Sequence, residues 1–394
     1  MKDKSKTKLI FKDGTTFEGK SFGAKKSVAG EVVFATGMVG YPEALTDPSF
    51  RGQILVMTYP LVGNYGVPKK ESWESPRIQV AGLVVCNYVD TPSHYTSEMT
   101  LGKWFKKERV PLIQIKDTRA LTQKLRSEGV GLGKIVVGGK NVPFADPNLR
   151  NLVAEVSTKE IMHFTPSAFG SSPYGRGRKG GSTDNPQTIV LIDCGAKQNI
   201  VRRLAARGLK VAVVPWDTDV TKLHFSFSAV VISNGPGDPQ KAKITIENVK
   251  KIIKQEIPVL GICLGNQILT LAGGGSTYKL KFGHRSQNQP VIERGTSGPK
   301  CFLTTQNHGF AVGRIPDGFE EWFYNANDNT NEGIIHRSRP LMSVQFHPEA
   351  SPGPTDTDWV FDYFFKKAKI APTPGIGEIP YTRGRGRKNH HDKK

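Results

Sequence analysis

The chain has 394 residues, a length that suits two domains rather than one. It contains no run of eighteen or more apolar residues, which argues against a membrane span. The formal net charge is +20, but residues 1–8, 165–187 and 373–394 carry +3, +2 and +4 of it, so the expected domains are only moderately basic and we do not expect nucleic acid as a main partner.

The N-terminus is lysine-rich, but it lacks the apolar core of a signal peptide and the arginine-rich amphipathic length of a transit peptide. We therefore expect a cytoplasmic protein rather than a mitochondrial one. The cysteines lie far apart without a metal-ligand spacing, so we predict reduced thiols and no metal site. The four positions are Cys86, Cys194, Cys263 and Cys301.

Residues 1–156 predict a β-rich N-terminal domain, because short apolar runs alternate with Gly, Pro, Asn and Asp. Few clear helical patterns occur apart from residues 97–107 and 118–127. Residues 14–21 match the phosphate-binding P-loop pattern, yet no helical period follows them, and Asp13-Gly14 instead favours a hairpin turn. The glycines of residues 129–133 are also interpreted as a turn.

Residues 157–187 are interpreted as a linker, since their Gly, Ser, Pro and Arg content cannot bury enough apolar area. In residues 188–370, strands then alternate with helices, which predicts a C-terminal doubly wound parallel sheet and an α/β fold class. Residues 371–394 are expected to form a basic disordered tail, whose Arg-Gly pairs offer a weak RNA-binding hypothesis. The expected strands are 188–193, 210–215, 229–233 and 258–262, and the expected helices are 197–207 and 244–254.

One of these strands leads directly into a candidate nucleophile, in the sequence Gly261-Ile-Cys263-Leu-Gly265. A strand, a glycine-flanked cysteine and a helical pattern together indicate a nucleophile elbow with sulfur in place of a hydroxyl. The glycines permit a sharp bend, and the positive end of the helix dipole favours a thiolate. The other three cysteines lack such flanking glycines and are interpreted as core residues.

A base for this thiol is offered by Phe346-His347-Pro-Glu349. In an extended chain, His347 and Glu349 project on one face, so the carboxylate can orient the imidazole as in a catalytic triad. Acyl transfer also needs oxyanion donors. We expect one from the N–H of Leu264 and a second from Gly235 or Gly237, in the turn that follows strand 229–233.

With these motifs, the chain closely resembles the class I glutamine amidotransferases, which have a flavodoxin-like sheet. It resembles more narrowly the small subunit of carbamoyl-phosphate synthetase. The general likeness rests on the two segments around Cys263 and His347. The narrower likeness rests on Gly40-Tyr-Pro-Glu-Ala-Leu-Thr-Asp-Pro-Ser49, Tyr59-Pro-Leu-Val-Gly-Asn-Tyr-Gly66, Asp117-Thr-Arg-Ala-Leu-Thr122 and Gln306-Asn-His-Gly-Phe310.

The resemblance implies hydrolysis of L-glutamine through a thioester on Cys263, with passage of ammonia to a large synthetase subunit. That partner would use ATP and bicarbonate to make carbamoyl phosphate for the pyrimidine or arginine pathway, and no cofactor is expected on this chain. The family's glutamine contacts fall here on Ser49, Gly235, Gly237, Leu264, Gln267, Asn307, Gly309 and Phe310.

Three features depart from much of the family. Asn266 replaces the His or Met of many glutamine-using relatives and resembles the branch with the ammonia-dependent urea-cycle enzymes, but those lack the cysteine that this chain keeps. The chain also stops after the amidotransferase domain, as a separate subunit or a truncated product would. Two alternatives stay open: an amidotransferase for GMP, CTP or anthranilate synthesis, which the β-rich domain disfavours, and a non-catalytic subunit that contacts RNA.

Overall fold

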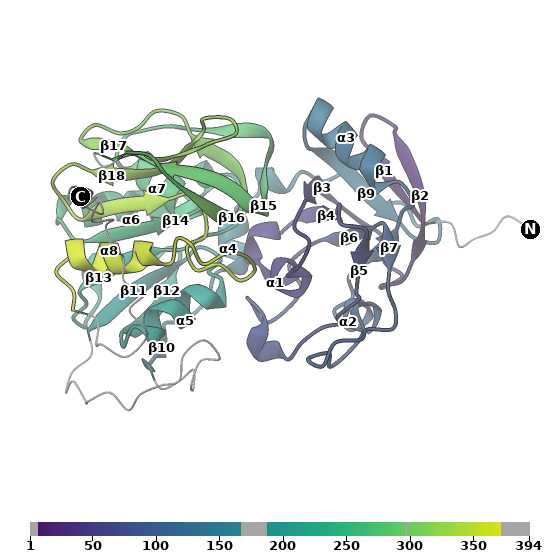
Figure 1. The fold of residues 1–394 in the computed structure, drawn as a ribbon, viewed down its shortest axis with the longest axis horizontal. Helices are drawn as coiled ribbons and strands as arrows, with labels where there is room; N and C mark the ends of the chain where they lie inside the picture. Colours follow the sequence, from purple (N-terminus) through teal and green to yellow (C-terminus); the bar gives the residue numbers. More distant parts are fainter. Residues whose placement is uncertain (1–6, 167–186, 296–297, 372–394) are drawn as a thin grey trace, which may run out of the picture.

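The computed structural model describes residues 7–166, 187–295 and 298–371. Two domains lie side by side, the first drawn in purple to blue and the second in teal to yellow (Figure 1). The predicted tail, apart from residue 371, and most of the predicted linker lie outside the described residues.

The first domain is built around a closed barrel, which explains its many short strands. Three neighbouring pairs in the barrel are parallel, namely β3–β4, β4–β6 and β6–β8. The other four pairs are antiparallel, namely β1–β2, β1–β9, β2–β8 and β3–β9. In barrel order the strands are β1 (Thr7–Phe11), β2 (Thr16–Ser21), β8 (Leu112–Gln114), β6 (Gly82–Val85), β4 (Gln53–Met57), β3 (Val28–Ala35) and β9 (Gly131–Val136).

Successive residues of the barrel strands point into two different apolar clusters, as the two-residue period of a strand requires. Ile54 packs in a cluster that includes α3, and the next residue, Leu55, packs in a cluster that includes α1 and α2. The helices are α1 (Tyr41–Thr46), α2 (Leu101–Lys107), α3 (Thr118–Glu128) and α4 (Leu152–Val156), with a small sheet of β5 (Leu61–Val62) and β7 (Asn87–Tyr88). In Figure 1, α1 lies at the boundary with the second domain.

The second domain holds a ten-stranded sheet whose centre is parallel and whose far side is an antiparallel extension. The strands, in sheet order, are β10 (Met162–Phe164), β12 (Lys210–Pro215), β11 (Thr188–Asp193), β13 (Ala229–Ile232), β14 (Val259–Ile262), β19 (Leu341–Val344), β18 (Asn331–His336), β16 (Lys300–Val312), β15 (Thr277–Glu293) and β17 (Phe319–Asn325).

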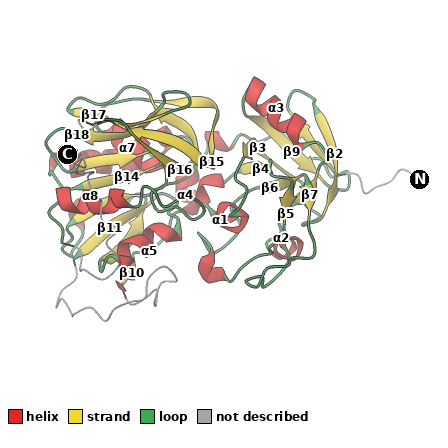
Figure 2. Cartoon of the chain, viewed as in Figure 1, coloured by secondary structure: helices red, strands yellow, loops and turns green. Residues whose placement is uncertain are grey.

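Helices cover both faces of the parallel part, so the predicted doubly wound α/β fold is confirmed (Figure 2). Leu191 shares an apolar cluster with helices α5 and α8, whereas its neighbour Ile192 shares one with α6 and α7. The helices are α5 (Gln198–Ala206), α6 (Lys243–Lys254), α7 (Leu264–Ala272) and α8 (Trp359–Lys367). None of the helices in the described ranges has the length and apolar composition needed to cross a bilayer.

Three local predictions need correction. Met162–Phe164, assigned to the linker, forms edge strand β10 antiparallel to β12. The helix expected at 97–107 begins only at Leu101, because the Thr100 side chain accepts a hydrogen bond from the N–H of Lys103 and so caps it there. Within 129–133, Gly129 ends α3, but the residues from Gly131 onward belong to β9 rather than to a turn. The P-loop match is a β1–β2 hairpin, as predicted.

Candidate active site

Cys263 occupies the bend between β14 and α7, with φ 55° and ψ −100°. The flanking glycines are required by close backbone approach: a Cβ on Gly261 would lie 2.5 Å from the Gly265 carbonyl oxygen, and one on Gly265 would lie 2.2 Å from the Ile232 oxygen. The N–H of Cys263 donates to Val344 of β19 at 2.8 Å, which fixes the bend to the sheet. The bend is thus the elbow that the sequence predicts.

His347 and Glu349 follow the end of β19 and are almost completely buried. The His347 Nδ1 lies 2.6 Å from Glu349 Oε1, and the ammonium of Lys197 lies 3.0 Å from the same carboxylate oxygen. Among the described residues, no nitrogen or oxygen atom is a hydrogen-bond partner of the buried His347 Nε2, and the Cys263 sulfur is close enough to the ring to interact with it. The structure therefore brings the three predicted triad residues together.

The charges of this group reinforce one another. Burial alone would lower the pKa of His347, but the Glu349 carboxylate and the Cys263 sulfur together raise it to about 10. Burial alone would raise the pKa of Glu349, but Lys197 and His347 lower it to about 2. At neutral pH the site therefore holds an imidazolium oriented by a carboxylate, which is a proton donor placed beside sulfur.

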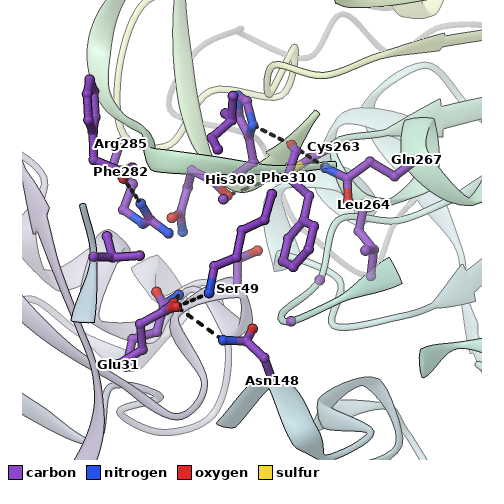
Figure 3. A pocket seen from close by; sticks show the side chains of 18 residues that line it. Glu31, Ser49, Asn148, Cys263, Leu264, Gln267, Phe282, Arg285, His308 and Phe310 are labelled. Carbon is purple, nitrogen blue, oxygen red and sulfur yellow. Dashed lines mark hydrogen bonds and ion pairs between the residues drawn. The ribbon is translucent and has the colours of Figure 1, made fainter. Parts of the chain in front are cut away.

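A pocket of about 480 Å³ opens onto Cys263 between the two domains (Figure 3). All eight predicted glutamine contacts line it, namely Ser49, Gly235, Gly237, Leu264, Gln267, Asn307, Gly309 and Phe310. His347 instead lines a second cavity of about 510 Å³, together with Asp47 and Lys197. The nucleophile and the imidazole thus border different cavities.

The polar residues of the pocket are held by defined bonds. Gln267 Nε2 donates to the Phe310 carbonyl at 2.8 Å, and Asn307 Nδ2 donates to Asp47 Oδ2 at 2.8 Å. Ser49 lies on the short 3-10 helix η1 (Pro48–Phe50) of the first domain, where its hydroxyl accepts from Asn234 Nδ2 at 2.9 Å. The first domain therefore reaches directly into the pocket.

Several residues that line the pocket or the neighbouring cavity were not foreseen from the sequence. Glu31 of the first domain pairs with Lys279 at 2.5 Å and accepts from Asn148 Nδ2 at 3.1 Å, which forms part of the wall in Figure 3. Asp47 bridges Asn307 and the loop after β13, and Lys197 neutralises the triad carboxylate. Asp47 lies inside a segment already noticed as distinctive, Gly40 to Ser49, but no local signal marks the other residues as neighbours of a site.

Two family models match the chain: Glutamine amidotransferase class-I over residues 190–367, and Carbamoyl-phosphate synthase small chain, CPSase domain, over residues 9–135. A carbamoyl phosphate synthase arginine-specific small chain of Aspergillus niger is 42% identical over 395 residues, which cover 94% of this chain and 83% of that protein. The chain belongs to the carbamoyl-phosphate synthase small-chain family.

Longer relatives match equally broadly. The Multifunctional protein CAD of Squalus acanthias is 48% identical over 376 residues, and the mitochondrial carbamoyl-phosphate synthase [ammonia] of Mus musculus is 45% identical over 373 residues. Each match covers 92% of this chain, but only 16% and 24% of those proteins, respectively. The chain therefore spans about a quarter or less of the length of these relatives.

Asn266, the departure noted within this family, lies behind the elbow and does not line the pocket. Its side chain donates to Gln345 Oε1 at 3.1 Å and accepts from the Ser343 hydroxyl at 2.7 Å. Gln345 Nε2 in turn lies 3.7 Å from the Cys263 sulfur. Asn266 thus joins β19 to α7 and contacts Gln345, which also accepts from the pocket residue Gln267 at 3.2 Å.

The remaining cysteines only partly fit the prediction that they are core residues. Cys194 is fully buried, and burial raises the pKa of its thiol. Cys86 is half-buried, and Cys301 is exposed on β16, which corrects the expectation for that residue. Its strand neighbours are apolar in part, but this end of β16 lies outside the parallel core.

Within the described ranges, one group of side chains has the composition of a metal site: His284, His308 and Glu332, whose ligand atoms lie within 4.8 Å of one another. These groups already contact one another or nearby residues. His284 lies 3.5 Å from Glu332 and 2.9 Å from Asp328, and His308 Nδ1 donates to the Phe310 carbonyl at 2.9 Å. We interpret the group as a set of buried polar contacts that hold His308 in the wall of the pocket.

Proposed function

We propose that the chain hydrolyses L-glutamine to glutamate and ammonia through a thioester on Cys263. The observation that carries this proposal is the convergence of Cys263 and every expected glutamine contact on one pocket, with the His347–Glu349 pair beside the sulfur. These residues come from both domains and from distant parts of the sequence.

In the first step, the Cys263 thiolate attacks the side-chain amide carbon of glutamine, and the π electrons of the carbonyl bond move onto its oxygen, which becomes an oxyanion. The N–H of Leu264, the first of α7, has no acceptor within the helix and suits this oxyanion, with a second donor from Gly235 or Gly237. The imidazolium of His347 then gives its proton to the departing ammonia. Water, deprotonated by the neutral imidazole, releases glutamate and restores the thiolate.

The head group of glutamine carries one ammonium and one carboxylate. Ser49, Gln267 and Asn307 provide hydroxyl and amide groups, and Gly309 and Phe310 provide the adjacent backbone. This set can bind both charges by hydrogen bonds while the amide end reaches Cys263. The Ser49 contribution makes the complete pocket a two-domain structure.

The proposed partner is a carbamoyl-phosphate synthetase large subunit, which would bind ATP and bicarbonate, so that this chain needs no cofactor. The match of residues 9–135 to the CPSase domain supports this acceptor over GMP, CTP or anthranilate synthesis. The product would enter the arginine or pyrimidine pathway, and we propose a cytoplasmic location. A contribution of the Arg-Gly tail concerns residues that the structure does not describe.

The test is a glutaminase assay on the purified chain, alone and with a large subunit. Slow release of glutamate alone and faster release with the partner are expected, because partner contact can complete a site. Cys263→Ser should abolish glutamate release both without and with the large subunit. The matched control Cys301→Ser changes an exposed thiol and should leave glutamate release intact under both conditions. Absence of a glutamyl thioester and of glutamate release from the wild-type pair would refute the proposal and favour a non-catalytic subunit.

A further inference from the structure

A second carboxylate of the first domain, Glu74, is fully buried against the second domain. Its Oε1 accepts from the Ser351 hydroxyl at 2.6 Å and from Arg202 Nη1 at 3.2 Å, and its Oε2 accepts from the backbone N–H of Asn199 at 2.9 Å. Three separate donors of the second domain therefore converge on one side chain of the first. None of the proposed catalytic steps uses Glu74.

The contact with Asn199 completes the start of α5. The residue before this helix, Lys197, provides no side-chain cap, although the first N–H groups of a helix need acceptors. Glu74 supplies two of them, since its carboxylate accepts from Asn199 and its backbone oxygen accepts from Gln198 at 2.9 Å. A carboxylate is also the charge that the positive end of the helix dipole favours.

The start of α5 in turn holds the triad acid. The Lys197 ammonium lies 3.0 Å from Glu349 Oε1 and also donates to the Ala350 carbonyl, and the Asn199 amide donates to the backbone oxygen of Glu349. Ala350 and Ser351 have positive φ values of 56° and 55°. Such backbone is costly for residues other than glycine and persists when surrounding contacts over-determine it. Here those contacts come from Lys197, Asn199 and Glu74.

We infer that Glu74 is a positioning residue through which the barrel domain fixes the orientation of Glu349, and hence of His347. This inference rests on the proposed glutaminase function and adds a residue to it. Glu74 does not line the glutamine pocket, so its effect reaches the reaction only through the start of α5 and the loop after Glu349.

The charge balance indicates what loss of Glu74 does. Around it lie Lys197 just before α5, Arg202 of α5 and Glu43 of α1, and Lys197 also faces Glu349 and Asp47. In Glu74→Gln, the Lys197 ammonium loses one of its neighbouring carboxylates. Lys197 then draws more strongly on the negative charge of Glu349, so the Glu349 carboxylate stabilises the His347 imidazolium less. The NH2 group of the new amide would also face at least one of the hydrogen-bond donors that now contact Glu74, and two donors cannot bond each other. The alkaline limb of the glutaminase pH profile should therefore move to lower pH.

The experiment measures glutamate release by the full chain from pH 6 to 10, with active sites counted by alkylation of Cys263 with a glutamine-analogue electrophile. For Glu74→Gln we expect kcat per titrated thiol to fall roughly tenfold to a hundredfold, the range of a lost hydrogen bond to a charged group, with KM nearly unchanged. Glu71→Gln, an exposed carboxylate three residues earlier, is the matched control and should behave as wild type. Ser351→Ala removes a single Glu74 contact and should give a smaller change in the same direction.

The outcomes separate the two hypotheses. A wild-type chain without glutaminase activity overturns the proposed function. An active wild type, together with a Glu74→Gln variant that has normal kcat per titrated thiol and an unmoved pH profile, overturns only the positioning role. A lower number of titrated thiols with an unchanged profile also overturns it, because a purely structural residue changes the folded fraction and not the titration. If Glu74→Gln fails to fold, the same criteria apply to Ser351→Ala.

Discussion

Replacing Glu349 by Gln tests the electrostatic core of the site, because the amide has the same shape but no charge. The substitution replaces the anionic acceptor 2.6 Å from His347 Nδ1 by a neutral amide and removes one counter-ion 3.0 Å from Lys197. Lys197 keeps Glu74 and Asp47 as nearby acids, so we expect the domain to fold. The reaction, in contrast, loses the group that keeps the imidazole protonated and oriented.

The magnitude follows from the pKa of His347, which rises from 6.5 to about 10 although burial opposes the change. That difference corresponds to roughly 5 kcal/mol at about 1.4 kcal/mol per pH unit, shared mainly between Glu349 and Cys263. If about half of it acts in the transition state, the loss of roughly 2.5 kcal/mol lowers kcat by about sixtyfold. KM should change little, because Glu349 does not line the glutamine pocket.

The assay is steady-state glutamate release per titrated Cys263, combined with acid-quench trapping of the thioester. Glu349→Gln should lower kcat and leave glutamine binding intact, and Glu71→Gln provides a charge-matched control on the surface. A kcat within threefold of wild type would show that the carboxylate does not support the imidazolium, and the electrostatic account of the site would then be wrong.

Three further outcomes follow from the structure. Asp47→Asn deprives Asn307 of an anionic acceptor at 2.8 Å and should raise the KM for glutamine by roughly tenfold to a hundredfold in the same assay; an unchanged KM would contradict this. Gly265→Ala places a Cβ 2.2 Å from the Ile232 oxygen and should lower the thermal midpoint by several degrees, measured by calorimetry against Gly295→Ala, whose Cβ meets nothing within 4 Å. The pKa of His347 is raised to about 10, so its ion pair with Glu349 stabilises the fold fully below pH 6.5 and less as the pH rises through about 10. The pKa of Glu349 is lowered to about 2, so its contribution is complete above pH 4.5 and is lost as the pH falls through about 2. The ion pair is therefore complete between pH 4.5 and pH 6.5. The difference in unfolding free energy between wild type and His347→Gln should therefore be largest between these two limits, and a difference that grows toward pH 10 would refute the assignment.

The parts of the structure that the sequence predicts are those with local signals. Strands β11 and β12 have the predicted bounds, because continuous apolar runs flanked by polar residues mark buried parallel strands. The signal for the elbow is equally local. Gly261 and Gly265 are needed because the backbone passes too close for a Cβ, at the junction of β14 with α7 and against the adjacent strand β13. His347 and Glu349 are separated by two residues, so their pairing also follows from local chain geometry.

The missed features depend on contacts between distant segments. The closure of the barrel brings β1 beside β9, more than a hundred residues later, and nothing in either strand specifies that partner. Lys197 and Asp47 show the same limit: each is a charged residue that would be expected on the surface, and each is buried because a partner arrives from elsewhere. A sequence pattern reports the residue, but the compensating charge is visible only after folding.

This contrast indicates how the site is assembled. The second domain alone places Cys263 and His347 at the carboxyl ends of β14 and β19, where open parallel sheets generally bind ligands. That edge contains buried polar groups whose partners belong to the barrel domain. Asp47 accepts a hydrogen bond from Asn307 in the pocket, and Glu74 accepts one from Asn199, near the triad acid. Burial of polar groups is tolerated only when they are paired, so the barrel is a condition for the geometry of the site as well as a neighbour of it.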